Sequence, residues 1–75
     1  MDPVAIRNRI SRAMGERRLK IADVARQSGL SYQTVFDLYH GKAQRIDLAT
    51  LDKLCRVLGV PVGELFEYVP DEMQP

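Results

Sequence analysis

Residues 21–40 read IADVARQSGLSYQTVFDLYH. Apolar residues recur at helical spacing in this stretch, stop at Ser28-Gly29 and resume after Ser31. Gly29 can supply the left-handed backbone that ends one helix, and the Ser31 hydroxyl can cap the next by accepting a free amide N–H. The stretch therefore predicts two short helices, over about 21–28 and 32–39, joined by a tight glycine turn.

The flanking sequence predicts three further helices. Asp2-Pro3 is a good helix start, so we expect a first helix running to about residue 18. Its apolar face would hold Ile6, Ile10, Ala13 and Met14. Asp47 is the expected cap of a fourth helix, which Gly59 ends. Its apolar stripe would be Leu48, Leu51, Leu54, Cys55 and Leu58. A short fifth helix is expected over residues 61–66, followed by extended residues 68–70.

These elements predict the fold class and the domain limits. We expect an all-α, compact five-helix domain over residues 1–70, with no pair of strands and a disordered tail over residues 71–75. The chain has 75 residues, which suits one small domain.

Charge is unevenly distributed along the chain. The net charge is only +1, but residues 1–45 carry +5 and residues 46–75 carry −4. The N-terminal part therefore suits a phosphate-bearing partner, although ordinary solvated surface would give a similar count.

Composition also limits the possible functions. No apolar run follows the start, and no window approaches the roughly 18 apolar residues of a membrane span, so we expect a cytoplasmic protein with no membrane partner. One histidine, His40, and one cysteine, Cys55, cannot supply a metal site or a disulfide. Since neither a phosphate-binding glycine loop nor a nucleophile–base pair is present, we expect no enzyme and no cofactor.

The spacing of Ala25, Gly29, Leu30, Val35 and Leu38 is that of a helix-turn-helix. Together with residues 39–42, 46–55, 58–60 and 64–71, this motif resembles the phage repressor/Cro-type, or Xre-like, helix-turn-helix family, in particular its small single-domain bacterial members. The resemblance implies a repressor-like DNA-binding domain with its helix-turn-helix at helices two and three. It also implies that helix three enters the major groove of double-stranded DNA. The function implied is sequence-specific transcriptional regulation, with a homodimer on a palindromic site.

The sequence departs from the family pattern at three positions. Lys20-Ile21 stands where the family commonly has Thr-Gln, whose Gln can support a recognition residue. His40 replaces the usual Asn before the exit Gly-Lys, and Pro61 replaces a capping Ser or Thr. The particular polar contact that the family makes at the start of helix two is therefore absent.

Helical geometry selects the residues of helix three that could read bases. Val35, Leu38 and Tyr39 share an inward side. The base-reading candidates are Tyr32, Gln33, Phe36 and Asp37. Gln33 can pair with adenine, whereas Tyr32 and Phe36 could contact a thymine methyl group or instead pack in the core or a dimer. Asp37 could accept from cytosine, but we favour its pairing with a basic neighbour.

Residues that frame helix three are the phosphate candidates. They are Lys20, Ser31, Thr34, Lys42 and Arg45, and the alternative for the cations is plain surface charge. Val62, Phe66, Tyr68 and Val69 could form a dimer surface, or Phe66 and Leu65 could simply seal helix one. A different function also fits: a protein-interaction module, antitoxin-like or regulator-binding, that keeps the helix-turn-helix fold.

Overall fold

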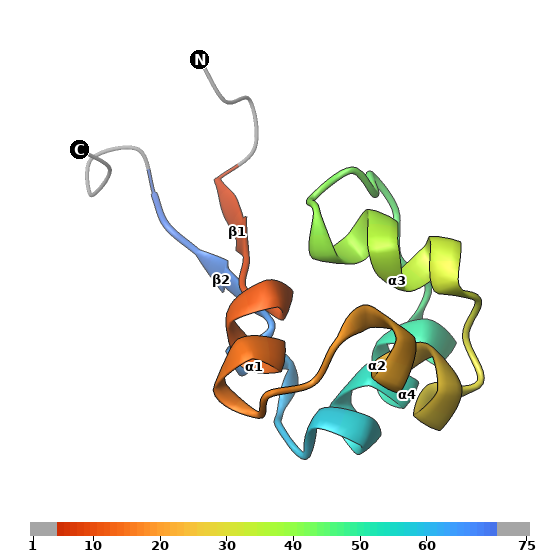
Figure 1. Ribbon diagram of the computed structural model, residues 1–75. Coiled ribbons are helices and arrows are strands. Elements are labelled where there is room, and N and C mark those ends of the chain that lie inside the picture. The colour runs from red at the N-terminus through yellow and green to blue at the C-terminus, as the bar shows by residue number, and fades with distance from the viewer. Residues whose placement is uncertain (1–4, 71–75) are drawn as a thin grey trace.

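The computed structural model describes residues 5–70, which form a small helical body with a two-stranded ribbon at one side (Figure 1). The elements in chain order are β1 (Ile6–Asn8), α1 (Ile10–Glu16), α2 (Ile21–Ser28), α3 (Tyr32–Tyr39), α4 (Leu48–Leu58), the 3-10 turn η1 (Val62–Glu64) and β2 (Phe66–Tyr68). The domain is therefore mostly helical. The expected Asp2-Pro3 cap and the tail over 71–75 lie outside the described residues.

The predicted helix-turn-helix is present as α2 and α3. Gly29 ends α2 with a φ of 78°, and its N–H donates to the Ala25 carbonyl at 3.0 Å. The Ser31 hydroxyl then caps α3 by accepting the Thr34 N–H at 3.0 Å. Both turn residues therefore act as the sequence predicted, because the left-handed glycine and the side-chain cap satisfy helix-end groups locally.

The two ends of the domain differ from the prediction. β1 pairs antiparallel with β2, with Ile6 opposite Tyr68 and Asn8 opposite Phe66. The expectation of no strand pair was therefore wrong, and so was the helix through residue 6, since α1 begins only at Ile10. The expected fifth helix is reduced to η1. Each strand has three residues, and its backbone groups are satisfied by a partner about 60 residues away, which local periodicity does not reveal.

A single apolar core joins the helices to the base of the ribbon. Its buried residues are Ile10, Ala13, Met14, Val24, Val35, Leu38, Leu54, Leu58, Val60 and Leu65. Besides Ile6, which is 47% exposed in β1, two inward predictions fail: Leu48 is 81% exposed, and Tyr39 is 37% exposed. Both lie at a helix end, where the stripe runs past the edge of the core. Cys55 is a free, half-buried thiol packed against the core.

Helix α4 closes the body against α2. The Asp47 carboxylate caps α4 by accepting the Thr50 N–H at 2.7 Å, and Gly59 ends the helix with a φ of 68°. This cap and this end were both predicted. Over residues 5–70, no helix has the length and apolar character needed to cross a membrane.

Candidate nucleic-acid interface

Helix α3 presents one side to the core and the opposite side to solvent. Val35 and Leu38 are buried and hold the helix against the body. On the other side, Tyr32 is 55% exposed and Gln33 is exposed, while Phe36 and Asp37 are half-buried. The structure therefore brings the four base-reading candidates together on one short helix.

Gln33 and Asp37 form a polar pair on this face. The Gln33 amide nitrogen Nε2 donates to Asp37 Oδ1 at 2.8 Å, one helical turn away. The predicted pairing of Asp37 with a basic neighbour was wrong in this respect, because its partner among the described residues is the neutral amide. A carboxylate only accepts, so the NH₂ group of Gln33 must face it. The Oε1 atom and the second N–H of Gln33 then remain available for another partner.

Three rings run along α3 beside the polar pair. The Tyr32 and Phe36 ring centroids are 6.3 Å apart, and those of Phe36 and His40 are 4.3 Å apart. Lys42 Nζ lies 5.2 Å from the centroid of the Phe36 ring, within the range of a cation–π contact. The Lys42 backbone N–H donates to the Asp37 carbonyl at 2.8 Å, so the exit loop, residues 41–45, folds back over the end of α3. The Lys42 cation is thereby held beside the aromatic row.

The other phosphate candidates surround α3 in different ways. The Ser31 hydroxyl donates to Thr34 Oγ1 at 2.8 Å in addition to its capping bond. Arg45 is exposed on the exit loop. Lys20 is exposed immediately before α2, and its backbone N–H donates to Asp23 Oδ2 at 3.0 Å. Lys42 and Arg45 thus flank the C-terminal end of α3, whereas Lys20 belongs to the start of α2.

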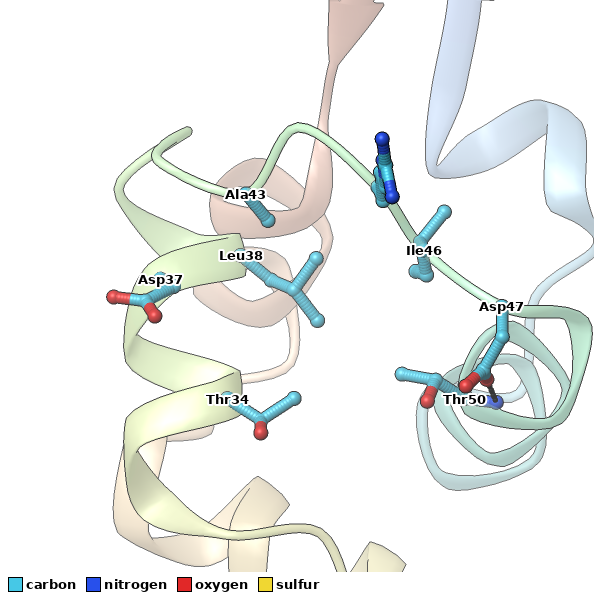
Figure 2. Close-up of a pocket in the computed structure, with 8 residues that line it drawn as sticks. Thr34, Asp37, Leu38, Ala43, Ile46, Asp47 and Thr50 are labelled. Carbon is cyan, nitrogen blue, oxygen red and sulfur yellow. Dashed lines mark hydrogen bonds between the residues drawn. The ribbon is translucent and has the colours of Figure 1, made fainter.

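A cleft of about 320 Å³ separates α3 from the exit loop and the start of α4 (Figure 2). It is lined by Thr34, Asp37, Leu38, Ala43, Arg45, Ile46, Asp47 and Thr50. Figure 2 shows Thr34 and Leu38 pointing into the gap, whereas the Asp37 carboxylate points away from it. Arg45 shares this lining with the Asp47 carboxylate, so the cleft lacks the excess positive charge that a phosphate pocket requires. The outer face of α3 is the better candidate site.

Two carboxyl groups at helix starts, those of Asp47 and Asp23, have lowered pKa values because of hydrogen bonds to nearby residues. The Thr50 N–H that donates to Asp47 lowers the pKa of this carboxyl group. The Lys20 N–H does the same for the pKa of Asp23, with a further contribution from Arg26 at 3.2 Å. Both carboxylates are therefore held in their charged, capping form. In the described part of the chain, no three His, Cys, Asp or Glu side chains are grouped as metal ligands would be.

The sequence predicted the residues of this face but not two of their contacts, the bond between Gln33 and Asp37 and the contact of Lys42 with Phe36. The four-residue spacing of Gln33 and Asp37 is a known signal for a helical side-chain pair and could have predicted the bond. The position of Lys42 over Phe36 depends on the path of the exit loop. No periodicity in the sequence encodes that path.

Comparison with known proteins agrees with this geometry. Residues 9–71 match the family of Cro/C1-type HTH DNA-binding domains, so the chain belongs to that family. It is also similar to the uncharacterized HTH-type transcriptional regulator YozG of Bacillus subtilis (strain 168). The two sequences are 29% identical over 59 residues, which cover 79% of this chain and 70% of YozG. The Xre-like resemblance of the sequence is thereby confirmed.

Proposed function

We propose that this protein is a sequence-specific transcriptional regulator that binds double-stranded DNA with α3 in the major groove. The observation that carries the proposal is the outer face of α3, where the oriented Gln33 amide lies on the same short helix as a row of rings and the Lys42 cation lies beside the Phe36 ring. Membership of the Cro/C1-type family supports the same reading. The protein acts by binding, without catalysis or a cofactor, and it works in the cytoplasm.

Gln33 is the proposed base reader. With one N–H bonded to Asp37, its second N–H can donate to adenine N7 while Oε1 accepts from adenine N6. Tyr32 and Phe36 supply apolar surface for a thymine methyl group or a sugar. Asp37 acts on the amide of Gln33 and does not itself contact a base.

Backbone phosphates are the proposed partners of Lys20, Ser31, Thr34, Lys42 and Arg45. Lys42 and Arg45 follow α3, and Lys20 precedes α2, so the cations frame the helix-turn-helix at both ends. Such contacts fix the register of a protein on DNA but carry no sequence information. They would give the affinity, whereas Gln33 and its neighbours would give the preference.

Two copies are proposed to bind one palindromic site, with their α3 helices about 34–36 Å apart. The apolar surface available for such a contact includes Val62, 49% exposed, and Tyr68, 67% exposed. Phe66 is instead half-buried against the core, so it contributes less to an outer surface.

A salt titration of duplex binding tests the proposal. Phosphate contacts release counterions, so the affinity for a mixed-sequence duplex should fall steeply and linearly on a log–log plot against salt. Selection from random duplexes then supplies the preferred site. Gln33→Ala should relax the preference at one position, whereas Lys42→Ala should weaken binding to all sequences alike.

A protein-interaction module is the second candidate function. The carboxylate of Asp37 on the outer face of α3 favours it, because a negative charge in a DNA groove is repelled by phosphates. If no duplex binds even at low salt, the DNA proposal is wrong and this second function takes its place.

A further inference from the structure

Asn8 connects three elements through one side chain. Its Oδ1 accepts the Ile10 N–H at 2.9 Å, which satisfies a free amide at the start of α1. Its Nδ2 donates to the Leu38 carbonyl at 2.8 Å, in the last turn of α3. The first bond joins residues two positions apart and closes a local turn. The second spans thirty residues and reaches the helix that carries the candidate DNA-reading face.

The ribbon that carries Asn8 is itself fixed to the core. Asn8 lies opposite Phe66, which packs on the core, and the next residue, Arg9, donates its N–H to the Leu65 carbonyl at 2.7 Å. Leu65 is fully buried. The amide of Asn8 therefore extends from a rigid base and not from a loose terminal segment.

The end of α3 that Asn8 reaches needs such support. The last carbonyls of a helix lack partners within the helix. Leu38 O otherwise receives the Gly41 N–H at a long 3.3 Å. This same end carries Phe36 and Asp37, and Figure 1 shows it directed toward the ribbon. A helix of eight residues is about 12 Å long, so a tilt of about 10° moves its far end by about 2 Å.

We propose that Asn8 is a positioning residue for DNA recognition, which fixes the C-terminal end of α3 relative to the body of the domain. The proposal rests on the proposed function. Base reading requires side chains held to within about 0.5 Å and 10–20° of the geometry that binds the bases. If the end of α3 is not fixed, the protein should therefore lose its preference for one DNA sequence before it loses its contacts with phosphates. The ribbon thus acts on recognition without touching DNA.

Asn8→Ser separates the two bonds. A serine hydroxyl can still accept the Ile10 N–H but is too short to reach Leu38, and the charge is unchanged. The experiment measures affinity for the selected duplex and for a mixed-sequence duplex of equal length, and it records amide ¹H–¹⁵N spectra of the free protein. We expect the ratio of the two affinities to fall about fivefold or more. Mixed-sequence affinity should change less than twofold, and the amide signals of residues 36–41 should shift.

Two further variants complete the test. Asn8→Ala removes both bonds and should lower the thermal midpoint more than Asn8→Ser, at a similar loss of the affinity ratio. Glu67→Gln removes the negative charge that pairs with Arg9 at 3.5 Å on the same ribbon and leaves both Asn8 bonds in place. This control should leave the affinity ratio unchanged.

Three results would overturn the inference. Asn8→Ser could leave the affinity ratio unchanged, or it could leave the signals of residues 36–41 in place. It could also lower both affinities equally, in step with the unfolded fraction, which would show a purely structural role. If the wild-type protein prefers no duplex sequence, the proposed function fails instead. The amide spectra then still decide whether Asn8 fixes the end of α3.

Discussion

Replacing Asp37 by alanine should change DNA binding through two terms of opposite sign. The carboxylate faces the same side of α3 as Gln33, so its removal takes a negative charge away from the proposed DNA surface. A unit charge about 8 Å from a phosphate costs about 0.5 kcal/mol in water, so two such phosphates give about 1 kcal/mol. Asp37→Ala should therefore raise mixed-sequence affinity at low salt by about twofold to fivefold.

The second term is the loss of orientation at Gln33. Its 2.8 Å bond to Asp37 is of the helical type worth about 0.2–0.5 kcal/mol. A freed Gln side chain must also give up rotamer entropy when it binds, up to about 1.5–2 kcal/mol for complete fixation. Because binding fixes the Gln33 side chain only in part, we expect Asp37→Ala to lower the preference for the selected site by about 0.5–1 kcal/mol, or roughly twofold to fivefold. At low salt the two terms nearly cancel on the selected site.

Salt and a double mutant separate the terms. Fluorescence anisotropy on the selected and mixed duplexes should show the gain disappear near 0.5 M salt, since charges are screened there, while the loss of preference persists. Glu64→Ala removes the same charge from η1, beside Arg9 and Arg12, and should leave the preference intact. In the Gln33→Ala background, Asp37→Ala should no longer affect preference. If it affects preference equally in both backgrounds, Asp37 reads the DNA itself and the reasoning is refuted.

Three other perturbations follow from the structure. Lys42→Ala should lower affinity for every duplex and reduce the salt slope by about one unit, and an unchanged slope would show that Lys42 serves only the Phe36 ring. Stability should fall as the pH drops below about 4, because the pKa of Asp47 is lowered in the folded state and its contribution is present only above the unfolded value. Asp47→Asn keeps an acceptor for the Thr50 N–H, so the free energy of unfolding, measured with urea, should fall less steeply below about pH 4. A fall as steep as in the wild type would contradict the role of Asp47. Tyr68→Lys should shift sedimentation equilibrium toward monomer with little change in the thermal midpoint, since the side chain is 67% exposed, and a persistent dimer would place the interface elsewhere.

The sequence predicted well those parts of the fold that local chemistry controls. Gly29, Ser31 and Asp47 act within four residues of their own position, so their turn and cap roles could be read directly. The errors lie where distant segments meet. Ile6 has helical spacing from Ile10, yet it pairs with Tyr68, about 60 residues away, in a strand. A periodic pattern cannot distinguish these outcomes, because the deciding hydrogen bonds are made by the backbone of another segment.

The candidate site shows the same division. Helical angles placed the four reading candidates on one outward face, but they did not determine which of them bond to each other. Asp37 was expected to meet a cation, and instead it holds the Gln33 amide. A contact one turn away on the same helix needs no loop to close, so it forms at lower entropic cost than a pair with an exit-loop cation.

The bond between Gln33 and Asp37 helps to explain how the chain manages without the family's usual Thr-Gln at the start of α2. The family pattern commonly has Thr-Gln there, where the Gln supports a recognition residue from the neighbouring helix, and this chain has Lys20-Ile21. Ile21 packs against the core, so it offers no polar group to α3. The amide of Gln33 is held from within α3, by Asp37, at 2.8 Å. The Gln33 amide is then oriented from within α3, whereas the Asn8 bond to the Leu38 carbonyl holds the end of the helix. Transfer of residues 31–40 into a related domain should therefore carry the preference only where the recipient also holds the end of α3.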